Sequence, residues 1–261
     1  AAVAVTIPAV TQAERPLQSP RELVWEDTFD GDSLDYSKWE IEQNAFGGGN
    51  QELQIYTDRP ENVRVAAGKL VIEARRDNAS ISGTTREYSS GRLRTKHRGD
   101  WRYGRIEVFA KLPKGRGLWP AIWMLPTDDK YGGWASSGEI DIMEMRGQTP
   151  NVVLGTLHYG RPWPDNTHSG DEYRLPQGDF SDDFHLFAVE WKEGEIRWFV
   201  DGKHVQTQTK WHSSGGSFPA PFDQRFHLLL NLAVGGEFLG PPDESTPFPA
   251  RMEIDFVRVY Q

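Results

Sequence analysis

The chain has 261 residues, no cysteine and a formal net charge of −9 at pH 7. The lack of cysteine excludes disulfides and thiolate chemistry, and an acidic chain without a basic block argues against a nucleic-acid partner. The 26 glycines, 17 prolines and 10 tryptophans indicate many turns and predict low helix content, because glycine and proline disfavour helices. At this length, one large β domain is as natural as two smaller ones.

The first 21 residues are rich in small residues and proline, and they predict an N-terminal arm with little regular structure. The segment has no basic stretch followed by a long apolar core, so it is not an intact signal peptide, although it could be the end left after cleavage of one. No apolar run in the sequence reaches the roughly 18 residues of a membrane helix. We therefore expect no membrane partner and a single domain over residues 22–261.

From residue 23 onward, short strand-like segments alternate with turn signals, a pattern typical of a sandwich or jelly roll. Two hairpin signals, Glu193-Gly194 and Asp201-Gly202, separate three consecutive antiparallel strands. One segment, residues 226–236, is apolar on both faces and predicts a central strand. The segments with the clearest strand pattern are residues 68–75, 104–112, 186–207, 226–236 and 252–260.

The segment "GEIDIMEMRG", residues 138–147, alternates acidic and apolar residues as a strand with one dry face does. Glu139 and Asp141 share one face, and strict alternation would place the next acid at residue 143. Glu144 reaches that face only if a β-bulge absorbs one extra residue and resets the parity. We therefore predict a bulge that brings three carboxylates to one face of the strand.

With the bulge, four strand steps of about 3.3 Å place the Cα atoms of Glu139 and Glu144 roughly 13 Å apart. Two such side chains that lean together can bring their carboxyls to about 5–5.5 Å, the separation found in retaining glycosidases. Asp141 can share a proton with Glu139, and the two charges raise the proton affinity of Glu144. Two alternatives remain open, a solvated acidic strand face and a calcium site of three carboxylates.

Tryptophans precede the acidic strand, with Trp119 and Trp123 in "GLWPAIWMLP" and Trp134 in "YGGWASSGEID". Indole rings stack on the flat C–H face of sugars, so tryptophans beside carboxylates favour a glycan cleft over a solvated face. Trp119 is the better stacking candidate, whereas Trp123 fits a core position nearly as well. His158 in "GTLHYG" could contact Asp141 or a sugar, or be structural.

Taken together, "NQELQIYT", "SGRLRTK", "GLWPAIWMLP", "GEIDIMEMRG", "GTLHYG" and "NLAVGG" resemble glycoside hydrolase family 16, most closely its bacterial laminarinase branch of endo-1,3-β-glucanases. The resemblance runs from about residue 23 to residue 261. It implies an all-β jelly-roll sandwich of two curved antiparallel sheets with a concave substrate cleft. It makes Glu139 the nucleophile, Asp141 its assistant and Glu144 the acid/base. The sugar contacts that it implies are Asn50, Glu52, Arg92, Trp119, Trp123, Trp134, His158, Trp163 and Asn231.

The bulge is informative within the family, because lichenase-type members resemble a shorter form that lacks Met143. The bulged form resembles laminarinases and enzymes of algal galactans, and Trp119 with the overall similarity favours 1,3-β-glucan. Many members bind a structural calcium on the convex face, and Glu26, Gly68 and Asp255 occupy the matching places. No cofactor is needed for the chemistry that the resemblance implies.

We expect a secreted, extracellular and monomeric enzyme that cleaves β-1,3-glucan internally, by double displacement with retention. Its partner would be a β-glucan polysaccharide. The alternatives are a recognition module that binds glucan without cleaving it, and a relative acting on mixed-linkage glucan or algal galactan. A transglycosylase would use the same residues.

Overall fold

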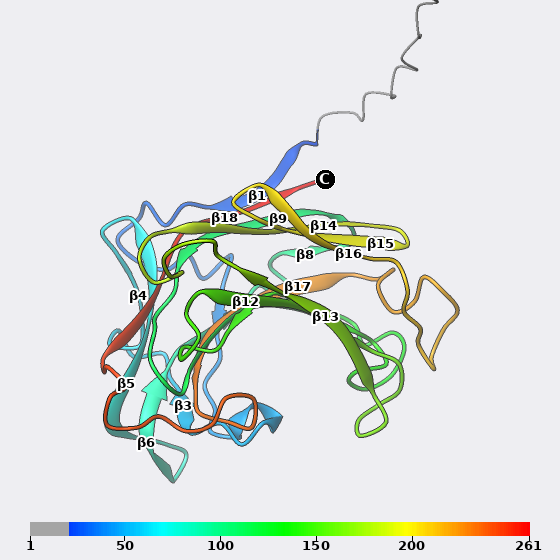
Figure 1. Cartoon of the computed structure of the whole chain (residues 1–261). Coiled ribbons are helices and arrows are strands. Elements are labelled where there is room, and N and C mark those ends of the chain that lie inside the picture. Colours follow the sequence, from blue (N-terminus) through cyan, green and yellow to red (C-terminus); the bar gives the residue numbers. More distant parts are fainter. Residues whose placement is uncertain (1–20) are drawn as a thin grey trace, which may run out of the picture.

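The computed structural model describes residues 21–261, which form two stacked β-sheets (Figure 1). The outer sheet contains, in hydrogen-bonded order, β16 (Lys203–Gln208), β15 (Glu195–Val200), β14 (His185–Lys192), β9 (Gly104–Lys111), β18 (Ala250–Tyr260), β5 (Lys69–Ile81), β6 (Thr84–Ser90) and β3 (Gln54–Tyr56), with β1 (Leu23–Asp27) beside β18 and β4 (Val63–Ala66) beside β5. The inner sheet contains β13 (Thr167–Arg174), β12 (Val152–Tyr159), β11 (Glu139–Met145), β10 (Leu118–Pro126), β17 (Phe226–Val234), β7 (Arg92–Arg94) and β2 (Glu40–Ile41), with β8 (Asp100–Trp101) beside β17.

The inner sheet is curved, and the outer sheet covers its convex side, so the concave side faces away from the outer sheet (Figure 1). The predicted all-β jelly roll is confirmed. One pairing differs from the expected antiparallel pattern, because β3 and β6 run parallel. All other strand pairs within residues 21–261 are antiparallel.

The hydrophobic core lies between the two sheets and follows the alternation of the strands. On β9, Ile106, Val108 and Ala110 are fully buried, while the residues between them are half-buried. All nine residues of β17 are buried, which confirms the predicted central strand. Strands that are buried on both faces lack the usual apolar and polar alternation, as β17 does.

The predicted hairpins join β14, β15 and β16 into an antiparallel meander. Gly194, Asp201 and Gly202 all have positive φ angles, between 50° and 76°, as tight hairpin turns require. The only helical segment within residues 21–261 is the short 3-10 turn η1 (Gly47–Gly49). Accordingly, this part of the chain contains no helix that could span a membrane.

The predicted N-terminal arm, residues 1–21, lies outside the described residues except for Arg21. The Arg21 guanidinium lies 2.7 Å from the Glu190 carboxylate of β14. The division of the chain into an arm and a single domain stays a prediction.

Candidate active site

The predicted β-bulge is present on β11. Between Asp141 and Glu144, this strand has two residues, Ile142 and Met143, where the neighbouring strand β12 has only Gly155. The pairing with β10 shifts at the same point. The extra residue resets the parity of the strand, as expected for a bulge.

The bulge separates apolar and acidic side chains onto opposite faces of β11. Ile140, Met143 and Met145 are fully buried in the core between the sheets. The three carboxylates point the other way, onto the concave face of the inner sheet. Two of them are half-buried there, and Asp141 is 2% exposed.

Residues of the other strands hold the bulge in place. A bulge leaves backbone groups without ladder partners, and the Asp141 carbonyl instead accepts a hydrogen bond of 2.9 Å from Trp198 Nε1 of β15. Gln206 Nε2 of β16 donates to the Gly155 carbonyl at 2.7 Å. A Cβ atom at Gly155 would lie only 2.5 Å from the Trp198 ring, so glycine is required opposite the bulge. The outer sheet thereby fixes the backbone beneath the carboxylates.

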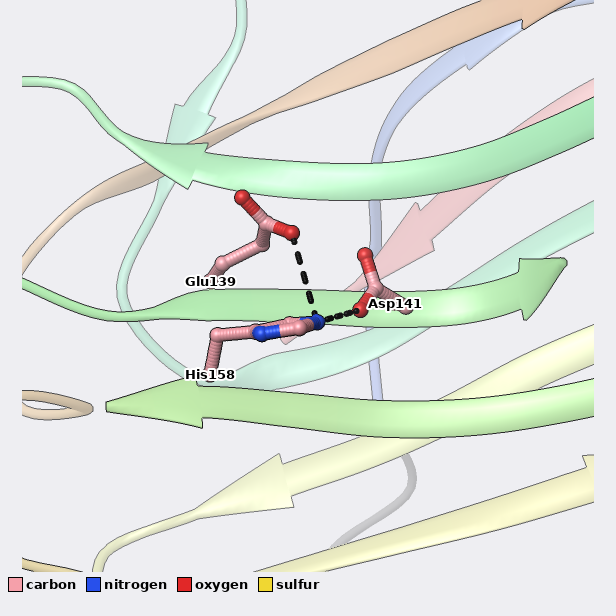
Figure 2. A group of neighbouring side chains, drawn as sticks. All are labelled: Glu139, Asp141 and His158. Carbon is pink, nitrogen blue, oxygen red and sulfur yellow. Dashed lines mark ion pairs between the residues drawn. The ribbon is translucent and has the colours of Figure 1, made fainter. Parts of the chain in front are cut away.

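Glu139 is held from two sides. Trp134 Nε1 donates to its Oε2 atom at 2.7 Å. His158, directly opposite on β12, places Nε2 3.8 Å from Glu139 Oε1 and 3.3 Å from Asp141 Oδ2 (Figure 2). Burial raises the pKa of both carboxyls, and the charge of Asp141 raises the pKa of Glu139 further. Both carboxyls therefore keep protons at pH values where exposed carboxyls have lost theirs.

Glu144 lies at the other end of the acidic row and accepts a hydrogen bond of 3.0 Å from Trp119 Nε1. Burial raises the pKa of Glu144 to about 8, and the charge of Asp141 adds to this effect. The Trp119 hydrogen bond acts in the opposite direction, because it stabilises the ionised carboxylate. At neutral pH, Glu144 thus carries a proton that it can donate.

A polar network adjoins the acids across β10, β17 and β7. Trp123 Nε1 donates to Asn231 Oδ1 at 2.6 Å, and the Arg92 guanidinium lies 4.8 Å from the centre of the Trp123 ring. Glu42 holds Arg92 at 2.8 Å, and Asn231 Nδ2 donates to the Tyr56 hydroxyl at 3.2 Å. The structure therefore brings three predicted sugar contacts together, with Trp123 and Asn231 joined by a hydrogen bond and Arg92 by its contact with the Trp123 ring.

Asn50 and Glu52 lie near the Glu144 end of the acidic row. Glu52 is 6% exposed and accepts hydrogen bonds from Gln54 Nε2 at 2.7 Å and Asn50 Nδ2 at 3.3 Å. A Cβ atom at Gly236 would lie within 3.6 Å of Asn50, Glu52 and the Trp119 ring, so the three residues surround this glycine. Because these hydrogen bonds occupy the Glu52 carboxylate, Glu52 supports its neighbours in the structure.

The tryptophans differ in how much ring surface they expose. Trp134 is 40% and Trp163 72% exposed, and the Trp163 backbone N–H donates to the Trp134 carbonyl at 2.7 Å. Trp119 is only 9% exposed, because its ring packs on Phe238 with the centroids 4.8 Å apart. Trp119 therefore acts on Glu144 through its N–H and offers little surface for stacking.

Some residues that support the site were not predicted from the sequence. Tyr56 and Glu42 support Asn231 and Arg92, and Trp198 supports the bulge. Tyr56 lies in the motif "NQELQIYT" at an even spacing from Glu52, so strand alternation was an available signal. Trp198 belongs to the other sheet, and nothing in its local sequence indicates a contact with Asp141.

The predicted calcium ligands lie on the convex side. Glu26 is on β1, Gly68 is in the turn between β4 and β5, and Asp255 is at a register shift of β18 against β9. The Glu26 carboxylate lies 3.4 Å from Arg258 Nε, so a cation there would have to break this ion pair. Asp255 has no ion-pair partner within residues 21–261.

Comparison with known proteins identifies the family. The sequence profile of the glycosyl hydrolases family 16 matches residues 50–258. The chain belongs to this family. It is 45% identical to the glucan endo-1,3-beta-glucosidase A1 of Niallia circulans, over 92% of the chain but 38% of that protein. It is also 45% identical to a beta-glucanase of Rhodothermus marinus, over 92% of the chain and 85% of that protein.

A solved structure gives the same result for the fold. The catalytic domain of an endo-1,3-beta-glucanase (laminarinase) from Thermotoga petrophila RKU-1 superimposes with a TM-score of 0.82 at 42% identity. The match covers 92% of this chain and 98% of that domain. The resemblance to family 16 that the motifs indicated is therefore confirmed.

Proposed function

We propose that the chain is an endo-acting glycoside hydrolase of laminarin-type β-1,3-glucan that works by double displacement with retention. The observation that carries the proposal is the bulge, which puts Glu139 and Glu144 on one face with Asp141 between them. Each glutamate is held by an indole N–H. The relatives named glucan endo-1,3-beta-glucosidase and laminarinase support the choice of linkage.

In the first step, Glu139 attacks the anomeric carbon while Glu144 protonates the departing glycosidic oxygen. Trp134 holds Oε2 of Glu139, which leaves Oε1 for the attack. The raised pKa of Glu144 keeps this acid protonated near neutral pH. Asp141 shares a proton with Glu139, so the nucleophile can ionise beside a neutral neighbour.

In the second step, Glu144 has lost its proton and acts as a base. It activates a water molecule that attacks the anomeric carbon and breaks the bond to Glu139. Two inversions at the same carbon restore the original configuration. Glu139 leaves as a carboxylate, and the hydrogen bond from Trp134 stabilises that charge.

Residues on both sides of the acidic row fit a long glucan chain. On one side lie Trp123 and the polar groups of Arg92 and Asn231. On the other side lie the exposed rings of Trp134 and Trp163. Stacking surfaces and hydroxyl partners on both sides support cleavage within a chain rather than at its end.

The test is a digestion panel of laminarin, curdlan, lichenan, agarose and carrageenan with the products sized over time. We expect rapid release of mixed oligosaccharides from laminarin, and none with Glu139→Gln or Glu144→Gln. The exposed Glu61→Gln is the matched control and should keep wild-type activity. Laminarin binding without any release of sugar would instead identify a recognition module, and faster cleavage of agarose or carrageenan would identify a galactanase.

We further propose that the protein is secreted, extracellular and monomeric. A polysaccharide substrate supports an extracellular location, because polymers of this kind do not enter cells. Size-exclusion chromatography with light scattering should give a mass near 29.6 kDa, and twice that mass would contradict a monomer.

We also propose a structural calcium on the convex face, held at Glu26, Gly68 and Asp255. The strand order supports this proposal, because β1 and β5 each pair with β18, and the β4–β5 turn directly precedes β5. The unpaired carboxylate of Asp255 and a backbone carbonyl are hard oxygen ligands of the kind that calcium prefers. The ion would join both ends of the domain and take no part in cleavage.

A further inference from the structure

Glu139, Asp141 and His158 together form a donor set that suits a transition-metal ion. We propose that these three side chains bind Zn²⁺, and that the bound ion blocks the nucleophile. The binding itself follows from the geometry of the three residues, whereas the blocking rests on the function proposed above.

The donor atoms already lie close to the spacing of a zinc site. One ligand atom from each residue lies within 4.8 Å of the other two (Figure 2). His158 Nε2 is 3.3 Å from Asp141 Oδ2 and 3.8 Å from Glu139 Oε1. Bonds of about 2.0–2.1 Å in a tetrahedron place neighbouring donors about 3.3 Å apart. Small side-chain rotations therefore suffice to close the site.

A second observation points to a missing ligand. Asp141 is 2% exposed, and its Oδ2 atom is buried without a hydrogen-bond partner. This oxygen is directed at His158 Nε2, within the same cluster. A buried carboxyl oxygen without a hydrogen-bond partner costs free energy, and a dication that replaces the carboxyl proton would supply a bond to this oxygen.

The types of ligand atom in this cluster favour a transition metal over calcium. An imidazole nitrogen with two carboxylates suits Zn²⁺ or Cu²⁺, whereas Ca²⁺ requires six to eight oxygen ligands. The Trp134 N–H on Glu139 Oε2 orients this ligand, as outer hydrogen bonds do in metal sites. Glu139 and His158 remain 13% and 23% exposed at their side chains, so an ion can reach them from solvent.

One feature limits the affinity. The second ring nitrogen of His158, Nδ1, is buried and has no hydrogen-bond partner within residues 21–261. Metal-binding histidines usually donate this N–H to an acceptor, and loss of such a partner typically weakens binding about 10–100-fold. We therefore expect a reversible site that is weaker than a structural zinc site.

The proposed zinc site and the catalytic step both use one atom, Oε1 of Glu139. Zn²⁺ would coordinate Oε1 of Glu139, the oxygen left free by Trp134 for attack on the sugar. A bound dication withdraws electron density from this oxygen and occupies the space in front of it that the anomeric carbon needs, so the first displacement stops. Zinc and substrate would exclude each other at this position.

The experiment measures metal binding first, on the substrate-free protein. Titration with Co²⁺ should give visible absorption bands of a low-coordinate site with one equivalent bound, and Zn²⁺ should displace the Co²⁺ while Ca²⁺ should not. His158→Gln and Asp141→Asn should each weaken binding at least tenfold. His168→Gln is the matched control, because this exposed histidine pairs with His158 across β12 and β13 but lies outside the donor set.

Inhibition is measured next, as laminarin hydrolysis by the wild-type protein at increasing Zn²⁺. We expect competitive inhibition that a chelator reverses. Wild-type protein that binds no Co²⁺ or Zn²⁺ at millimolar concentration would overturn the proposal, as would ligand variants that bind like wild type. Binding that leaves hydrolysis unchanged would overturn the blocking role. An absence of laminarin cleavage would refute the proposed function and leave the binding result intact.

Discussion

At the scale of single residues, the site depends on indole N–H groups that touch carboxylates. The hydrogen bond from Trp119 lowers the proton affinity of Glu144, while burial raises it, and burial has the larger effect. Glu144 therefore ends with a raised pKa of about 8. The alkaline limit of activity should report the loss of this proton.

Replacing Trp119 by Phe tests how its hydrogen bond affects the pKa of Glu144. The variant removes the donor that stabilises the ionised form, so the pKa of Glu144 should rise. We expect the alkaline limb of the kcat/KM profile to move upward by about one pH unit, together with a lower rate. Trp163→Phe is the control, because its indole N–H donates to no carboxylate within residues 21–261, and the alkaline limb of this variant should not move. A downward shift in Trp119→Phe would contradict the assignment of Glu144 as the acid.

Stability should depend on pH through the same residue. The raised pKa means that native Glu144 keeps its proton while the unfolded chain has already lost its own. The stability of the protein should therefore fall as pH rises from about 4.5 toward 8. Glu144→Gln has no charge to lose, so its melting temperature should match wild type near pH 4 and exceed it increasingly toward pH 8.

Melting curves measured at several pH values by calorimetry check this expectation. The exposed Glu61→Gln should show no such growing difference from wild type. A Glu144→Gln variant that is less stable than wild type at pH 8 would contradict the raised pKa.

The proposed catalytic acids could be predicted from the sequence, because the pattern that indicates them lies within one short segment. The parity break in "GEIDIMEMRG" lies within one strand, and it was sufficient to predict the bulge. The role of Trp119 could not be predicted in the same way. Its burial depends on Phe238, which comes from a loop far along the chain, and no local pattern shows which ring another residue will cover.

At the scale of elements, the bulge depends on a contact between the two sheets. Gly155 faces the bulge, and Trp198 from the outer sheet occupies the space where a Cβ atom would be. Gly155→Ala should push Trp198 away from the Asp141 carbonyl. We expect a loss of stability of about 1–3 kcal/mol and a reduced kcat, because the carboxylates above the bulge would move.

Thermal unfolding and laminarin kinetics measure the two effects. Gly31→Ala is the matched control, since an added methyl group there meets its nearest atoms at 3.6 Å. A Gly155→Ala variant with wild-type stability and kcat would show that this contact does not fix the bulge.

The elements themselves were predictable to different degrees. The β14–β15–β16 meander has turns with strong local signals, Glu193-Gly194 and Asp201-Gly202, and its strands lie next to each other in sequence. The parallel pairing of β3 with β6 has no such signal, because a parallel partner cannot be joined by a tight turn. Local patterns specify hairpins well and distant strand pairs poorly.

At the scale of the whole molecule, the outer sheet unites segments from both ends of the domain. β1 pairs with β18, and Glu26 of β1 lies beside Arg258. If calcium is bound at Glu26, Gly68 and Asp255, a chelator should release these segments from each other. We expect EDTA to lower the melting temperature and calcium to restore it, as ligand linkage requires.

Asp255→Asn is the variant that tests this site. It should melt at the temperature of the chelated wild type and gain nothing from added calcium. An EDTA-treated wild type that melts unchanged would refute the calcium proposal without affecting catalysis.

The position of β18 has a consequence for how the protein is made. This strand follows all other described strands in the sequence, yet it lies inside the outer sheet between β9 and β5. During synthesis on the ribosome, the edges of β9 and β5 that pair with β18 therefore stay unpaired until β18 has been made. Until residues 250–260 emerge, these open strand edges expose the nascent chain to aggregation.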